Sequence, residues 1–164
     1  MLKNGIKDPV SALTHFIGLL ACIPCIFALI FQASHQDAMT QVIGFAIFGL
    51  SLVLLYGAST IYHTLYVSEA KTILLRRIDH IMIFVLIAGT YTPICLVSLA
   101  GPWGWTMLAL IWILAIGGAV MKIFWIQAPR WLSTSLYIIM GWLAVIAFVP
   151  LQRAVSWDGV GLLL

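Results

Sequence analysis

Long apolar runs separated by short polar segments dominate the chain. About 20 apolar residues are needed to cross the hydrocarbon core of a bilayer as a helix, and the uncharged runs divide well at that length. We predict membrane-spanning helices over residues 10–31, 42–66, 78–99, 106–125 and 132–149, and the start of a sixth near residue 160. The pattern predicts an all-α, polytopic transmembrane helical bundle that forms a single integral membrane domain over residues 1–164.

One turn in this pattern is marked by residue type rather than by charge. No charged residue occurs between Asp79 and Lys122, a segment too long for one helix. The sequence Ala100-Gly-Pro-Trp-Gly104 lies near its middle, and glycine and proline in such a cluster favour a turn. We therefore predict two helices here, joined by that turn.

The composition agrees with a membrane location and excludes other classes of protein. Of the 164 residues, 63% are hydrophobic and only 8% are charged. A soluble domain carries roughly a quarter charged residues, so this chain is not water-soluble. The formal net charge is +3, but the basic residues are few and scattered between the apolar runs. We therefore expect no binding to nucleic acid, which requires a dense basic surface.

Three cysteines are too few for a disulfide framework. The sequence Cys22-Ile-Pro-Cys25 has the spacing of a redox pair, but it lies in an apolar run without a cationic neighbour to stabilise a thiolate. We interpret these cysteines as small packed or lipid-facing side chains.

The distribution of basic residues predicts the orientation in the membrane. Basic residues are in excess before the first predicted helix, between the second and third, and between the fourth and fifth: Lys3, Lys7, Lys71, Arg76, Arg77, Lys122 and Arg130. Loops on the cytoplasmic side carry such an excess. We therefore expect a multi-pass protein of the cell membrane with a cytoplasmic N-terminus.

A polar cluster is predicted near the cytoplasmic end of the second and third helices. Ser59 and His63 are one helical turn apart and share a face. A third helix that starts near residue 78 would place Asp79 in its first turn, at about the depth of His63. A simpler reading pairs Asp79 with Arg76 at the interface and treats His63 as a packing residue.

His63 is also a candidate ligand for zinc. A catalytic zinc site needs at least three protein ligands, and the sequence contains no His-x-x-His or His-x-x-x-His. The residues taken alone therefore amount to half of a metal site.

Several short motifs resemble, in the correct order, the signatures of the hemolysin III family, the bacterial branch of the progestin and adipoQ receptor family. They are Ser11-Ala-Leu-Thr-His15, Ser59-Thr-Ile-Tyr-His63, Ile78-Asp-His80, Ala88-Gly-Thr-Tyr-Thr-Pro93 and Met140-Gly-Trp142. The resemblance covers nearly the whole chain. It implies a fold of seven transmembrane helices with the N-terminus inside.

The resemblance also implies roles for the polar cluster. His63 would be a zinc ligand beside two histidines on a seventh helix, Ser59 would lie close to the site, and Asp79 would contact the metal through water. The chain ends inside the sixth helix of that pattern, with about five and a half helices present. We therefore expect a partial form of a longer protein, in which Zn²⁺ binds weakly or not at all.

Two further histidines are weaker candidates. His80 resembles a histidine of many bacterial members, and packing or an interfacial hydrogen bond is its simpler role. His15 is expected near the same cytoplasmic end, because the first helix begins there. Asp8 occupies the region of an acidic residue of the family, with aspartate in place of the usual glutamate.

Two classes of function follow. The first is a zinc-dependent hydrolase of amide or ester bonds in membrane lipids, with His63 as ligand, Asp79 as base or orienter, and Ser59 as a hydrogen-bond donor. The second is a non-enzymatic membrane protein, either a pore-forming hemolysin or a sensor or receptor. Membrane lipid is the expected partner, and a homo-oligomer is left open.

Overall fold

The computed structural model describes residues 5–36, 38–99, 101–125 and 127–154, with side chains up to residue 148. Its elements are α1 (Pro9–His35), α2 (Met39–Thr64), α3 (Glu69–Pro93), the π-helix η1 (Ile94–Ser98), α4 (Pro102–Phe124) and α5 (Arg130–Ala154). No strand occurs in these ranges, and the all-α prediction is confirmed. The sixth helix predicted near residue 160 lies outside the described residues.

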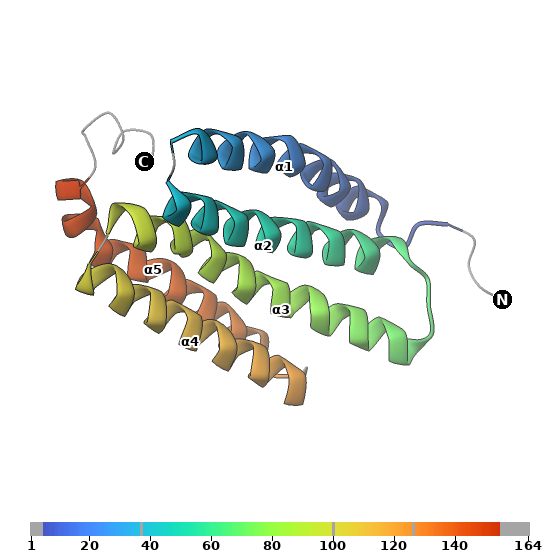
Figure 1. Ribbon diagram of the computed structural model, residues 1–164. Helices are drawn as coiled ribbons and strands as arrows, with labels where there is room; N and C mark the ends of the chain where they lie inside the picture. Colours follow the sequence, from blue (N-terminus) through green and yellow to red (C-terminus); the bar gives the residue numbers. More distant parts are fainter. Residues whose placement is uncertain (1–4, 37, 100, 126, 155–164) are drawn as a thin grey trace.

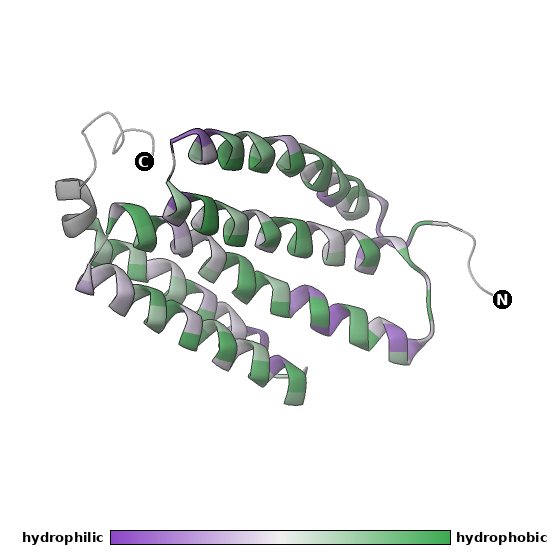
Figure 2. Ribbon diagram, viewed as in Figure 1, coloured by the Kyte–Doolittle hydropathy of each residue, from purple (hydrophilic) through white to green (hydrophobic). Residues whose placement is uncertain are grey.

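Each of the five helices is long and apolar enough to cross a membrane, when α3 and η1 are taken as one span. Their most apolar segments have mean hydropathies between 1.8 and 2.4. Figure 2 shows hydrophilic colour mainly at helix ends and on the first half of α3. The chain is therefore a polytopic membrane protein.

The helices alternate in direction and are joined by short connections (Figure 1). α1 packs on α2, α2 on α3, and α3 on both α4 and α5. The connections α2–α3 and α4–α5 lie at the same end of the bundle as the start of α1 (Figure 1). Residues near these three segments can therefore meet at one end of the molecule.

The start of α3 differs from the prediction. The helix begins at Glu69 rather than near residue 78, because a charged segment in the aqueous interface continues a helix as readily as an apolar one. Glu69 in the first turn also complements the helix dipole. Asp79 therefore lies about 15 Å along the axis from the start of α3, and not in its first turn.

Pro93 and two glycines shape the connection from α3 to α4. Pro93 has no N–H to donate, and the backbone widens after it into η1, where Leu99 N donates to Ile94 O at 2.9 Å. Gly101 has a φ of 105°, which favours glycine. A Cβ on Gly104 would collide with the carbonyl oxygen of Cys95. From Gly101 onward the predicted turn is thus present, and α4 begins in it at Pro102.

The core lies between α3, α4 and α5. Its fully buried members include Phe84, Ile111 and Met140. Tyr91 donates a hydrogen bond from its hydroxyl to Met140 O at 2.7 Å, and Trp112 Nε1 donates to Thr92 Oγ1 at 3.2 Å. The motif around Tyr91 and Thr92 therefore connects α3 to α4 and to α5.

Candidate functional site

His63, near the end of α2, forms a hydrogen-bonded pair with Asp8. The distance from His63 Nδ1 to Asp8 Oδ2 is 3.0 Å. An ionised carboxylate only accepts, so Nδ1–H is the donor and Nε2 keeps a lone pair in the neutral ring. Asp8 therefore selects one tautomer of His63 and holds the ring in one orientation.

The backbone explains why Asp8 reaches His63. Asp8 N donates to His63 O at 2.8 Å, and Lys7 N donates to Thr64 O at 3.3 Å. These bonds satisfy carbonyl groups in the last turn of α2, which have no partner within the helix. Lys7 Nζ also lies 3.5 Å from the centre of the Tyr62 ring. The segment before α1 thus caps the end of α2.

His15 joins this group from α1. Its ring stacks on that of His63, with 5.6 Å between centroids and 14° between planes. His15 Nδ1 lies 2.7 Å from Ser11 O, which accepts a hydrogen bond within α1. We define the His63 cluster as Asp8, His15, Tyr62 and His63, all at the end of the bundle where α1 begins and α2 ends.

Ser59 and Asp79 lie deeper in the bundle than this cluster. They are buried, with 3% and 9% of their surface exposed. Gly44 lies against Pro93, and Gly89 against Ser51. These two contacts define the antiparallel register of α2 and α3. Extended along both helices, the register places Asp79 at about the level of Ser59.

The expected equal depth of Asp79 and His63 is therefore wrong by about one helical turn. The error follows from the misplaced start of α3. Ser59 and Asp79 belong to contacting helices, whereas His63 is paired across α1 and α2 with Asp8.

The simpler reading of Asp79 as an ion pair with Arg76 does not hold. Within the described residues, both ion pairs involve Asp8, with Lys7 at 3.8 Å and His63 at 3.0 Å. Asp79 is consequently a buried carboxyl group without a cationic partner in this part of the chain. A carboxylate at such a position is costly unless it faces water or a ligand.

His80 faces another part of the molecule. Its carbonyl oxygen accepts a hydrogen bond from the Tyr137 hydroxyl at 3.3 Å, which joins α3 to α5. Its Nδ1 is buried and has no partner among the described atoms. His80 therefore packs toward α4 and α5.

The pairing of Asp8 with His63 was missed at the level of sequence. The signal was present, because Asp8 directly precedes the helix that begins at Pro9, and His63 is the penultimate residue of the next helix. Antiparallel neighbours with a short connection place these two positions at the same level. Spacing does not show, however, which carboxylate the imidazole turns toward.

The described side chains offer zinc an incomplete set of ligands. His63 suits one ligand position, because a metal-bound histidine commonly donates its other ring N–H to a carboxylate, as His63 does to Asp8. The described residues contain no group of three or more histidine, cysteine, aspartate or glutamate side chains placed to hold a metal. By themselves they do not form a complete zinc site.

Comparisons with known proteins agree with one another. A family model described as haemolysin-III related matches residues 4–162. Hemolysin-3 of Bacillus cereus is 43% identical over 164 residues, which cover 99% of this chain and 74% of that protein. The Hemolysin-3 homolog of Bacillus subtilis (strain 168) is 45% identical over 159 residues, 96% of this chain and 74% of that protein. No solved structure matches the chain significantly.

Proposed function

This chain belongs to the haemolysin-III family, and we propose that it acts in the cell membrane as a hydrolase of amide or ester bonds in membrane lipids. The observation that carries this proposal is the pair of Asp8 and His63. An imidazole held in one tautomer by a carboxylate is the arrangement that proton transfer and metal binding both require. The pair lies at the end of the helices, where a lipid headgroup meets water.

The remaining polar residues have distinct roles in the proposal. Asp79 is the buried carboxylate that accepts a proton from the attacking water, and Ser59 donates a hydrogen bond to the developing oxyanion. Both act in apolar surroundings, where such interactions are stronger than in water. Asp8 is a positioning residue, since it acts through His63.

Zinc is the cofactor that the proposal includes for this site. His63 would supply one ligand through Nε2, with Asp8 behind it. At least two further protein ligands are required, and they are not among the described residues. No step of the proposed chemistry is therefore derived from the metal.

The proposal is tested with purified protein reconstituted in lipid vesicles, by mass spectrometry of the released lipid products. We expect His63→Ala to lower turnover at least about 100-fold, in the range of a lost catalytic acid or base. The matched control is His35→Ala, at the opposite end of α1, where the ring contacts Phe31. Its turnover should stay within twofold of the parent protein.

The zinc content of both variants is measured in parallel by elemental mass spectrometry. A metal role for His63 predicts less bound zinc in His63→Ala than in His35→Ala. If His63→Ala kept both its zinc and its lipid turnover, the site assignment would be wrong.

A non-enzymatic role is the second candidate, and it rests on the name Hemolysin-3 carried by the relatives. A pore needs polar side chains along several helices. The exposed side chains of α4 and α5 instead include Ile113, Ile116, Ile138 and Val145. Dye release from vesicles without lipid turnover would support pore formation and replace the hydrolase proposal.

A further inference from the structure

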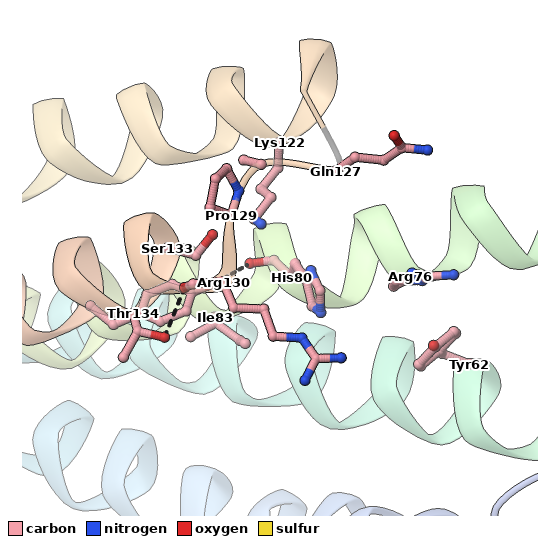
Figure 3. A pocket seen from close by; sticks show the side chains of 12 residues that line it. Tyr62, Arg76, His80, Ile83, Lys122, Gln127, Pro129, Arg130, Ser133 and Thr134 are labelled. Atoms are coloured by element: carbon pink, nitrogen blue, oxygen red, sulfur yellow. Dashed lines mark hydrogen bonds between the residues drawn. The ribbon is translucent and has the colours of Figure 1, made fainter.

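A cavity of about 640 Å³ lies at the end of the bundle where α4 ends and α5 begins. α3 forms another wall, and Tyr62 contributes from α2. Figure 3 shows Lys122 reaching from α4 toward His80 on α3, with Arg130 and Ser133 from α5 beside them. None of Ser59, His63 and Asp79 lines this cavity. The cavity shares Tyr62 with the His63 cluster, but none of the residues to which the hydrolase proposal gives a role lines it.

The charges on the cavity wall are all of one sign. Arg76, Lys122 and Arg130 line it, and no aspartate or glutamate does. Asp79 precedes His80 on α3 but is not part of the wall. Among the described residues no ion pair involves any of these three cations. An anion in the cavity would therefore give these cations a partner of opposite charge.

Burial makes this arrangement more costly. Lys122 is only 3% exposed, and its side chain lies on the cavity wall. A charge that is withdrawn from water and left unpaired is strongly destabilising. A bound anion would supply the partner that Lys122 lacks.

Two polar atoms on the wall lack hydrogen-bond partners in the described structure. Ser133 is 6% exposed, and its Oγ is buried without a partner. His80 Nδ1 is in the same situation. Buried polar groups are nearly always satisfied, so such atoms beside a cavity point to a ligand that would complete them. This observation is independent of the charges.

We propose that this cavity binds a phosphate group. Arginine binds phosphate through a fork of N–H donors, lysine through a point charge, and a serine hydroxyl through one more hydrogen bond. The cavity also adjoins the N-terminus of α5, where backbone N–H groups and the helix dipole favour anions. Carboxylates offer fewer acceptor oxygens to so many converging donors.

The phosphate has two sources, the headgroup of an anionic phospholipid and free inorganic phosphate. The cavity lies at one end of helices that are long enough to span a membrane, which is the level of lipid headgroups. Its volume also accommodates a complete headgroup. The experiment separates the two sources.

Binding is measured by native mass spectrometry of the purified chain in a non-ionic detergent. The probes are dioctanoyl phosphatidic acid, dioctanoyl phosphatidylcholine, whose phosphate is neutralised by choline, and inorganic phosphate as a competitor. We expect phosphatidic acid to bind at least tenfold more tightly than phosphatidylcholine. Competition by millimolar phosphate assigns the site to free phosphate, and its failure assigns the site to the lipid headgroup.

Charge variants locate the site. Arg130 is exposed, so Arg130→Gln should fold normally and weaken binding of phosphatidic acid about tenfold. Combining it with Lys122→Gln should weaken binding about 100-fold. The matched control is Lys71→Gln, an exposed cation at the same end of the bundle that does not line the cavity, with an expected change below twofold.

Ser133→Ala separates ligand binding from a structural role. Removing an unsatisfied buried hydroxyl should leave the thermal midpoint unchanged or raise it, whereas affinity for phosphatidic acid should fall severalfold. Three results would overturn the proposal: equal binding of the two lipids, equal losses in Lys71→Gln and Arg130→Gln, or unchanged affinity in Ser133→Ala. The hydrolase proposal is tested separately on His63 and Asp8, neither of which lines the cavity, so either proposal can fail without the other.

Discussion

At the scale of single residues, the contact between Asp8 and His63 serves position more than stability. Asp8 has 47% of its side-chain surface exposed, and exposed ion pairs contribute about 0 to 1 kcal/mol. The same contact determines which nitrogen of His63 is protonated. Its loss should therefore be visible in chemistry rather than in unfolding.

Asp8→Ala tests this difference. We expect lipid turnover to fall about 10- to 100-fold, as when a carboxylate behind a catalytic or metal-bound histidine is removed, with little change in thermal midpoint. Glu69→Ala is the control, because Glu69 is an exposed acid at the same end of the bundle. An equal loss in both variants would show that Asp8 acts only through general electrostatics.

The hydroxyl of Tyr91 is a second residue with a measurable role. It donates to Met140 O and to Gly141 O at 3.1 Å, which joins α3 to α5. We expect Tyr91→Phe to lower the free energy of unfolding in detergent by about 1 kcal/mol. Tyr66→Phe, in the exposed α2–α3 connection, should have no effect. Equal midpoints for the two variants would assign no stabilising role to the Tyr91 bond.

At the scale of helices, small residues determine how closely two elements approach. A Cβ on Gly118 of α4 would collide with the ring of Phe84 on α3, whereas nothing lies within 4 Å of the same position at Gly117. Adjacent glycines in one helix therefore have opposite surroundings. The contact between α3 and α4 therefore depends on Gly118 and not on Gly117.

Substitutions of Gly118 and Gly117 provide a matched test of helix packing. Gly118→Val should lower the free energy of unfolding by about 1 to 3 kcal/mol through overpacking. Gly117→Val should have a small effect, because the side chain enters open space. Thermal unfolding in detergent measures both. Similar midpoints for the two variants would contradict the described approach of α3 and α4.

At the scale of the whole molecule, charge is concentrated at one end of the bundle. The start of α1 and the connections α2–α3 and α4–α5 lie there (Figure 1). In the sequence, basic residues occur in or next to all three segments. We propose that this end faces the cytoplasm, in line with the positive-inside rule. The His63 cluster and the phosphate cavity would then both face the inner leaflet.

Cysteine labelling in whole cells checks this orientation. In a chain whose native cysteines are replaced, Ser68→Cys and Gln127→Cys should resist a membrane-impermeant thiol reagent, because both lie at the basic end. Gln36→Cys, in the α1–α2 connection, should react. All three side chains are exposed in the structure. The reverse labelling pattern would invert the proposed orientation.

The helices of this protein can be predicted from its sequence. A membrane-spanning helix needs a certain length and an apolar composition, and both can be recognised in the sequence alone. The turn before α4 could equally be predicted, from Gly101 and Pro102. The start of α3 was not, since hydropathy marks where a helix leaves the apolar layer and not where it ends. The predicted depth of Asp79 relative to His63 was wrong because it depended on the start of α3.

The sequence alone determined the class of the fold, the number of spans over residues 1–154 and a short set of polar candidates. Only the tertiary structure paired His63 with Asp8, turned His80 toward α5, and brought Arg76, Lys122 and Arg130 around one cavity. The physical reason is that helix periodicity sets which residues share a face. The neighbour that each face meets depends on how the helices pack, which no local pattern encodes.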